Sequence, residues 1–322
     1  MNNLMLNTAQ ELSSAEAGGD GDRWGVFSGG FEAALRGLMA TVGKAEIVTG
    51  VVEKTATEAV VAGGEPKGVL LLYTGQEKGV SKTGAMSLIG QNEKTGRNEL
   101  WSAYPMLGDG VEVNGVVGRL LLHPNHVEAT LEIGLESGVL IKAFDPLFCQ
   151  TRALYREGEP YRFSLSALAY SMSPPGNIEK VIDDPAGIRR FRAMEAWGEE
   201  HGQCENEDEA AALAAWQPET PKDLDPIRIN IGGGTMLVPS INGFSDDALY
   251  LGEVVGVTPD AVRIFDTGFW RVDVIVIRDD EVGTLTVPIY VAETLFDGEW
   301  RPSVGEHVTG NVWMQAYAKA RR

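Results

Sequence analysis

Two segments of this sequence repeat the same landmarks in the same order, and this internal echo constrains the fold more than any other feature. Each segment opens with a short Val-Val-Gly motif, continues through strand-like runs, and closes with a Gly-Glu pair and an alternating run. In both, a tyrosine stands twelve residues after the glycine of the Gly-Glu pair. The landmarks are Gly115–Gly118, Gly158-Glu159 and Tyr170 in the first segment, and Glu253–Gly256, Gly305-Glu306 and Tyr317 in the second. We interpret the echo as a degenerate duplication of one β module.

Short runs rich in valine and leucine, separated by Gly, Pro and charged turns, predict strands through both halves. The clearest hairpin joins Trp270–Arg278 to Thr284–Ala292, where apolar side chains alternate along each run. About five short strands per segment are typical of a small barrel or sandwich. We therefore predict a mainly β chain with two related small modules, each an OB-like barrel or a sandwich.

Helical periodicity appears at two places outside these strands. Apolar residues spaced along Ser28–Gly43 predict an N-terminal helix. Asp184 followed by Pro185 is typical of a helix start, and a second capping pattern begins at Asn206. The predicted organisation is a mobile tail (1–27), a first β module with its helix (28–172), an acidic helical connector (173–227) and a second β module (228–322).

Negative charge is concentrated in one stretch of the chain. The formal net charge is −19, and residues 193–227 carry ten acids and one base, a net −9. This balance disfavours broad binding to a phosphate backbone, which depends on clustered Lys and Arg. It favours a protein partner, with Glu205, Glu207, Asp208 and Glu209 of the connector as candidate contacts.

No apolar run approaches the roughly 20 residues that a transmembrane helix requires. The two cysteines, Cys149 and Cys204, lie in dissimilar contexts, which disfavours a disulfide framework. We expect a cytoplasmic chain that does not contact a membrane. The sequence leaves the oligomeric state open.

The motifs of common catalytic and cofactor sites are incomplete. Lys82-Thr83 follows a strand, but Gln76 and Ser81 stand where a phosphate loop needs glycine. The pairs His123/His126 and His201/Cys204 lie in predicted turns or loops, not in a zinc-ligand spacing. No nucleophile motif is present, and Cys149 and Asp145-Pro146 fit a buried thiol and a turn. We expect no catalytic residues, no metal and no cofactor.

Aromatic residues on predicted strands, together with nearby arginines, are the remaining candidates for a binding surface. These are Trp270, Trp313, Arg263 and Arg271. On an OB-like surface they could stack bases and contact phosphates, although large aromatics more commonly fill a core.

The sequence therefore predicts a non-enzymatic interaction protein. It would bind a protein partner through its β modules and acidic connector, as an assembly component or as an inhibitor of a nucleic-acid-handling partner. One alternative is a single-stranded nucleic-acid-binding protein with OB-like modules. The other is a metal- or nucleotide-dependent enzyme in an unfamiliar β fold.

Overall fold

In the computed structural model the chain forms two compact units. The larger unit comprises 1–174 and 234–322, and the smaller comprises 175–233. Within them, the described residues are 5–18, 23–47, 68–73, 83–92, 94–176, 179–201, 225–230, 233–240, 243–279, 283–296 and 298–321.

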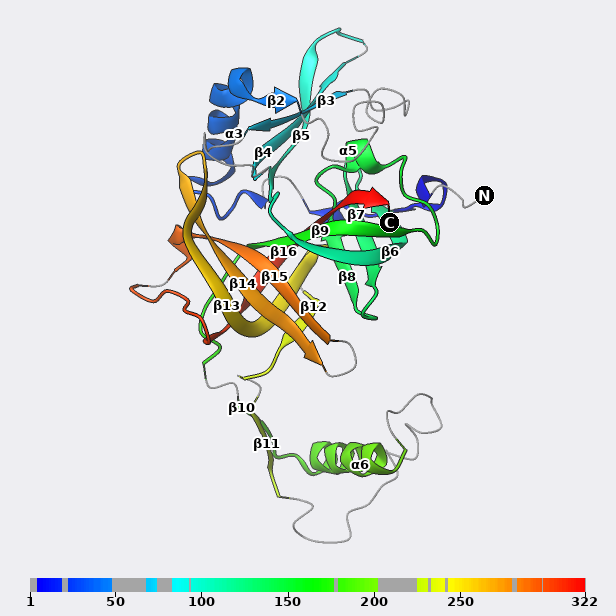
Figure 1. The fold of residues 1–322 in the computed structure, drawn as a ribbon, viewed down its shortest axis with the longest axis vertical. Helices are drawn as coiled ribbons and strands as arrows, with labels where there is room; N and C mark the ends of the chain where they lie inside the picture. Colours follow the sequence, from blue (N-terminus) through cyan, green and yellow to red (C-terminus); the bar gives the residue numbers. More distant parts are fainter. Residues whose placement is uncertain are drawn as a thin grey trace. The chain divides into compact units, whose positions relative to one another are not determined.

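The larger unit is organised around a closed ring of eight strands (Figure 1). Alternating apolar residues on these strands face a shared interior, as the hairpin pattern predicted: Val272, Val274 and Val276 are fully buried there. In the order in which they pair, the strands are β6 (Val111–Leu122), β7 (Ala129–Leu135), β8 (Leu140–Phe144), β16 (His307–Arg321), β13 (Asp247–Ile264), β14 (Thr267–Asp279), β15 (Gly283–Ala292) and β9 (Pro160–Ala169).

The strands β9 and β16, on opposite sides of the ring, also pair with each other. Their antiparallel ladder runs from the pair Tyr161–Arg321 to the pair Ala167–Met314. Around this ladder the pairings of the two halves correspond. β6 pairs with β7 and β9, as β13 pairs with β14 and β16; β8 meets β16 in parallel, as β15 meets β9. Strands of both halves thus contribute to one barrel.

A second sheet packs on the outside of the barrel. It contains β2 (Glu46–Ile47), β3 (Gly68–Tyr73), β4 (Gly84–Gln91) and β5 (Asn98–Met106), and the helix α3 (Gly30–Thr41) precedes it, followed by η2 (Val42–Lys44). A second hydrophobic core lies between this sheet and the barrel. In it, Leu70 and Met86 of the sheet cluster with Trp313 and Tyr317 of β16.

The helix α3 buries a narrower face than its periodicity predicted. Ala34 and Leu38 are buried, but Phe31 is 39% exposed and Met39 is 65% exposed. The helix therefore contacts the second core with only part of its apolar stripe.

Short elements complete the larger unit. The N-terminal segment contributes η1 (Met5–Thr8), β1 (Gln10–Glu11), which pairs in parallel with β6, and α1 (Ser14–Ala17). The connection from β8 to β9 carries α5 (Phe148–Thr151), and the connection from β15 to β16 carries η4 (Glu293–Leu295). The strand β12 (Met236–Pro239) pairs with β13.

The smaller unit contains the helix α6 (Pro185–His201) and an antiparallel pair, β10 (Glu179–Ile182) with β11 (Ile227–Asn230). The helix starts at the predicted Asp184-Pro185 signal, where Asp184 Oδ1 accepts a hydrogen bond from the N–H of Gly187 at 2.7 Å. The helix predicted from Asn206 lies outside the described residues.

The prediction of a mainly β chain containing a barrel is confirmed. The finer prediction of two OB-like modules is not confirmed, because strands from both halves close a single ring. Alternation along a strand identifies which of its residues share a face. It does not identify the neighbouring strand, or the half of the chain from which that neighbour comes.

A buried arginine ties the N-terminal segment to both halves of the barrel. Arg23 is 2% exposed, and its guanidinium lies 4.2 Å from the Phe144 ring and 4.7 Å from the Trp313 ring. Its nitrogens lie 3.3 Å from a carboxylate oxygen of Glu128 and 3.6 Å from one of Asp246. Phe144 and Glu128 belong to the first half, and Trp313 and Asp246 to the second.

The substitution Arg23→Ala should lower the free energy of unfolding by about 3–5 kcal/mol, because it leaves two buried carboxylates without their cation. Urea denaturation of the full chain measures the loss. The matched control is Arg36→Ala, since the Arg36–Glu32 pair is exposed on α3 and such pairs contribute about 0–1 kcal/mol. Equal effects of both substitutions would contradict this account.

Candidate functional site

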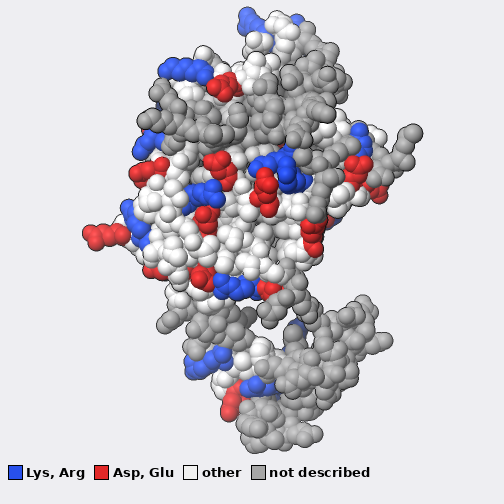
Figure 2. Space-filling view, in the orientation of Figure 1, with Lys and Arg blue, Asp and Glu red and all other residues white. Residues whose placement is uncertain are grey.

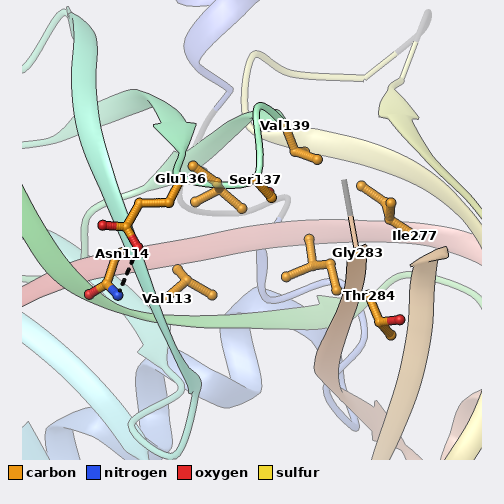
Figure 3. A pocket seen from close by; sticks show the side chains of 10 residues that line it. Val113, Asn114, Glu136, Ser137, Val139, Ile277, Gly283 and Thr284 are labelled. Carbon is orange, nitrogen blue, oxygen red and sulfur yellow. Dashed lines mark hydrogen bonds between the residues drawn. The ribbon is translucent and has the colours of Figure 1, made fainter. Parts of the chain in front are cut away.

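A pocket opens at one end of the barrel, between the turn that joins β7 to β8 and the ends of β14 and β15 (Figure 3). Its volume is about 170 Å³. The apolar lining comes from both halves: Val113, Leu135 and Val139 from the first, and Ile277 and Leu285 from the second. All five belong to or pack against the barrel core. The pocket is therefore an open extension of the barrel interior.

The topology of the ring explains why this space is left. β15 pairs with β9 only at Ile289 and Tyr290, in its second half. Its first residues, Gly283 to Leu285, pair with β14 alone among the described strands and line the pocket. A strand that leaves its neighbour in this way creates a gap, which is also lined by β6, β7, β14 and the turn between β7 and β8.

The rim of the pocket is polar and exposed. Asn114 Nδ2 donates to Glu136 Oε2 at 3.2 Å, and the Glu136 N–H donates to the Asn114 carbonyl at 3.1 Å (dashed line in Figure 3 for the former). Ser137 and Thr284 complete the rim and are exposed. Polar groups placed around an apolar floor are typical of binding sites in barrel mouths.

A second, much smaller groove adjoins the first half of β8. It has a volume of about 20 Å³ and lies between Leu140–Lys142 of β8 and Leu237–Pro239 of β12. This volume holds about one water molecule. We therefore do not treat the groove as a ligand site.

Trp270 lies in an aromatic cluster at the surface. Its ring centroid is 5.3 Å from that of Phe296, which is 6.0 Å from Trp300. The guanidinium of Arg301 lies 4.9 Å from the Phe296 ring and 6.0 Å from the Trp270 ring. Trp270 Nε1 donates to Glu293 Oε1 at 3.2 Å. The spacing of Phe296, Trp300 and Arg301 gave no strand signal, so the sequence interpretation included only Trp270.

The two arginines predicted to accompany Trp270, Arg263 and Arg271, form hydrogen bonds with groups outside this cluster. Arg271 points to the other side of β14, donating to Asp273 Oδ1 at 2.9 Å and to the Asp109 carbonyl at 3.1 Å. Burial opposes the charged form of Arg271, but the hydrogen bond and charge of the Asp273 carboxylate outweigh burial, so the pKa of Arg271 is raised. Arg263 is exposed and donates to the Asp266 carbonyl at 3.3 Å. Arg271 thus ties β14 to the loop before β6.

Trp313 is fully buried, and its indole Nε1 donates to Asp246 Oδ2 at 3.1 Å. Together with its contact to Arg23, this makes Trp313 a core residue with no ring face available to a ligand. The connector acids Glu205, Glu207, Asp208 and Glu209 lie outside the described residues.

A buried acid that the sequence interpretation assigned to a turn has a structural role. Asp145 is fully buried; its Oδ1 accepts from the Leu147 N–H at 2.8 Å, and its Oδ2 accepts from the hydroxyls of Tyr155, at 2.6 Å, and Thr151. Burial raises the pKa of Asp145 to about 6. These bonds fix the start of α5, and no property of Asp145-Pro146 in the sequence identifies Thr151 and Tyr155 as partners.

Other candidate chemical groups also have structural partners. The Cys149 thiol is buried and contacts the Val127 carbonyl at 3.1 Å, and burial raises its pKa to about 12. His123 is buried between Glu128, at 3.3 Å, and Thr130, at 3.0 Å. Within the part of the chain that the structure describes, no group of three or more His, Cys, Asp or Glu residues could hold a metal ion.

On the face shown in Figure 2, Lys and Arg residues of the larger unit are interspersed with Asp and Glu. Among the described residues of the larger unit, Arg271 pairs with Asp273 at 2.9 Å and Arg278 with Glu253 at 2.8 Å. The described charges on this face thus form a mixed surface.

The chain matches no protein-family model, no curated protein and no solved structure. None of the helices in the described ranges is long and apolar enough to span a bilayer.

The substitution Glu128→Gln should make stability less sensitive to acid. Burial opposes ionisation of Glu128, but Arg23, His123 and the Ser102 hydroxyl lower its pKa from 4.5 to about 2. Because the folded pKa lies below the unfolded one, the ionised carboxylate contributes stability above pH 4.5 that is lost as the pH falls toward 2. The stability difference between wild type and Glu128→Gln should shrink across that range.

Urea denaturation at several pH values from 5 down to 2.5 measures this difference. Glu32→Gln, at an exposed position on α3, is the matched control and should show no comparable trend. A difference that stays constant with pH would show that folding does not lower the pKa of Glu128.

Proposed function

We propose that this chain is a non-enzymatic interaction protein that binds a protein partner at the end of its barrel, with the acidic connector as a second contact. The observation that carries the proposal is the barrel-end pocket, in which an apolar floor lies inside an exposed polar rim. A pocket of about 170 Å³ is well below the 300–1,000 Å³ typical of sites for small-molecule ligands. It suits a single anchoring side chain of a larger partner, as in the hot spots of protein interfaces.

The buried titratable groups support binding over chemistry. Glu128, Asp145 and His123 each have hydrogen-bonding partners inside the core and lie apart from the lining of the pocket. Their arrangement is accounted for by the fold. We also propose that the two halves are copies of one module, which the corresponding order of their strand pairings supports.

A photo-crosslinking amino acid at Ser137 should capture the partner. Ser137 lies exposed on the pocket rim, so a bound partner comes within reach of this side chain. Exposed Glu157, in the turn before β9, provides the matched control position. Illumination in extracts of the native host should give one discrete protein adduct from position 137, competed by unlabelled full chain, and none from position 157.

The contribution of the connector is tested in the same assay. Replacing Glu205, Glu207 and Glu209 with Gln and Asp208 with Asn should reduce the adduct yield at least threefold while the circular dichroism of the chain is unchanged. An unchanged yield would remove the connector from the proposal, and the absence of any specific adduct would refute the proposal itself.

Single-stranded nucleic-acid binding is a second candidate, favoured by the cluster of Trp270, Phe296, Trp300 and Arg301. Base–aromatic stacking contributes about 1–3 kcal/mol per base. If the cluster stacks bases, a labelled oligonucleotide should bind the full chain at low salt and Trp300→Ala should weaken binding at least fivefold. Phe31→Ala, at an exposed aromatic on α3, is the control. No binding at low salt would eliminate this candidate.

A further inference from the structure

The first half of β15 has an open edge. Over residues 283–288, β15 pairs with β14 on one side, and no other strand of the described ranges pairs with it on the other. Pairing with β9 starts only at Ile289. Gly283 and Thr284 are exposed and Thr286 is half-buried, so the edge is accessible from outside. An accessible strand edge is a template to which another chain can add a strand.

A hydrogen bond of β14 shows which backbone groups this edge presents. Opposed residues of an antiparallel pair alternate between those that bond to each other and those whose N–H and C=O point away. The Arg278 N–H donates to Thr235 Oγ1 at 3.0 Å, and Thr235 precedes β12 on the β13 side of β14. Arg278 therefore points away from β15, and so does its partner Thr284 from β14. The backbone groups of Thr284, and of Thr286 two residues on, face the open edge.

The following residues of β15 agree with this alternation. The ladder with β14 is irregular between Ile275 and Ile277, but β15 runs through it without an extra residue. Pro288 therefore faces away from β14 as Thr284 and Thr286 do, and its missing N–H costs no ladder bond there. Beyond Pro288 the same side of β15 is taken up by β9. One side of this strand is thus paired at its end and open at its start.

The barrel-end pocket adjoins the open edge. Gly283, Thr284 and Leu285 line it together with Leu135, and its volume is about 170 Å³ (Figure 3). A cavity of about 150 Å³ lined by aliphatic side chains accommodates benzene, so the pocket has room for one large apolar side chain. In a strand added beside β15, alternate side chains would point to the barrel interior, as that of buried Leu285 does.

The corresponding strand of the first half, β8, offers a poorer edge. β8 meets β16 only at Phe144, so its start diverges in the same way. The groove beside it measures about 20 Å³, which is room for about one water molecule. β8 is also shorter, with 5 residues against 10 in β15. Of the two edges, that of β15 is the one with space for a side chain beside it.

We propose that the protein partner docks as an extended segment that adds a strand to β15 at residues 284–286 and inserts one large apolar side chain into the barrel-end pocket. This inference rests on the proposed protein-binding function and specifies the conformation and chemistry of its partner. Backbone hydrogen bonds to Thr284 and Thr286 provide affinity, and the pocket provides specificity for the apolar side chain. The partner segment therefore combines this residue with neighbours that favour strands and are not proline.

Hydrogen exchange in the free full chain tests whether the edge is open. The Val287 N–H points toward β14, whereas the Thr286 N–H points toward the edge. The protection factor of the Thr286 amide should therefore be at least tenfold lower than that of Val287. Equal protection of the two amides would show that the edge is already paired and would overturn the inference.

A capped heptapeptide, N-acetyl-Thr-Thr-Ser-Leu-Ser-Thr-Thr-amide, tests docking on the full chain. Its titration should shift the amide NMR signals of Thr284 and Thr286 and the methyl signals of Leu135 and Leu285 in a saturable manner. Bound peptide should raise the protection of the Thr286 amide at least fivefold. The same peptide with Gly in place of its Leu should bind at least fivefold more weakly, because it leaves the pocket empty.

Two substitutions at one position separate the backbone from the side chain. Thr286→Pro removes an N–H that faces the edge and leaves the bonds to β14 in place, so it should abolish the peptide shifts. Thr286→Val keeps the N–H and a similar shape, and its affinity should stay within twofold of wild type. Ser137→Trp, at an exposed rim position, obstructs the pocket without altering β15 and should weaken peptide binding at least fivefold.

The absence of saturable shifts at Thr284 and Thr286, or equal binding by Thr286→Pro and Thr286→Val, would overturn the inference. The crosslinking assay from position 137 distinguishes this failure from failure of the proposed function. An adduct lost in Thr286→Pro and retained in Thr286→Val supports strand addition. An adduct retained in both leaves a protein-binding chain that does not use this edge. The absence of any adduct would remove the function together with the inference.

Discussion

The guanidinium of Arg23 is the group on which the arrangement of the larger unit depends. It is buried between the rings of Phe144 and Trp313 and pairs with Glu128 and Asp246. Burying an isolated ion costs several kcal/mol, and partners offset this cost only when they are in place together. Those partners come from both halves of the barrel, and Arg23 itself comes from the N-terminal segment. The ion network is therefore satisfied in one arrangement of three distant parts of the chain.

The ladder between β9 and β16 likewise constrains the arrangement of the barrel strands. Both strands lie between neighbours from the two halves, so β8 and β15 each reach them only near their C-terminal ends. The first halves of β8 and β15 then diverge from the central ladder, and the barrel-end pocket and the smaller groove lie beside them. The barrel-end pocket is thus a consequence of how the ring closes, and its apolar floor is barrel core that the strands leave uncovered.

Periodicity predicted the parts of this fold that depend on one strand at a time. The inward faces of β14 and β15 and the start of α6 follow from local patterns in the sequence. Periodicity did not predict the surroundings of Trp313. Alternation placed it on one face of a strand, but residues 312–318 of β16 are buried on both faces, because the second sheet and Arg23 cover the outer one. The pocket could not be predicted from the sequence either, because its lining combines residues more than 100 positions apart.

A partner of the kind we propose would contact groups that are exposed on the folded chain. The core acids Glu128 and Asp145 are already engaged, the first by Arg23 and the second by two hydroxyls and a backbone N–H. Arg301 of the aromatic cluster donates to the carbonyls of Gly298 and Trp300, so it stabilises its own loop. At the barrel end, by contrast, an apolar floor that includes Leu135 and Leu285 lies inside a rim on which Ser137 and Thr284 are exposed. Because polar and hydrophobic contacts can be combined there, we propose this end of the barrel, ahead of the aromatic cluster, as the primary interface.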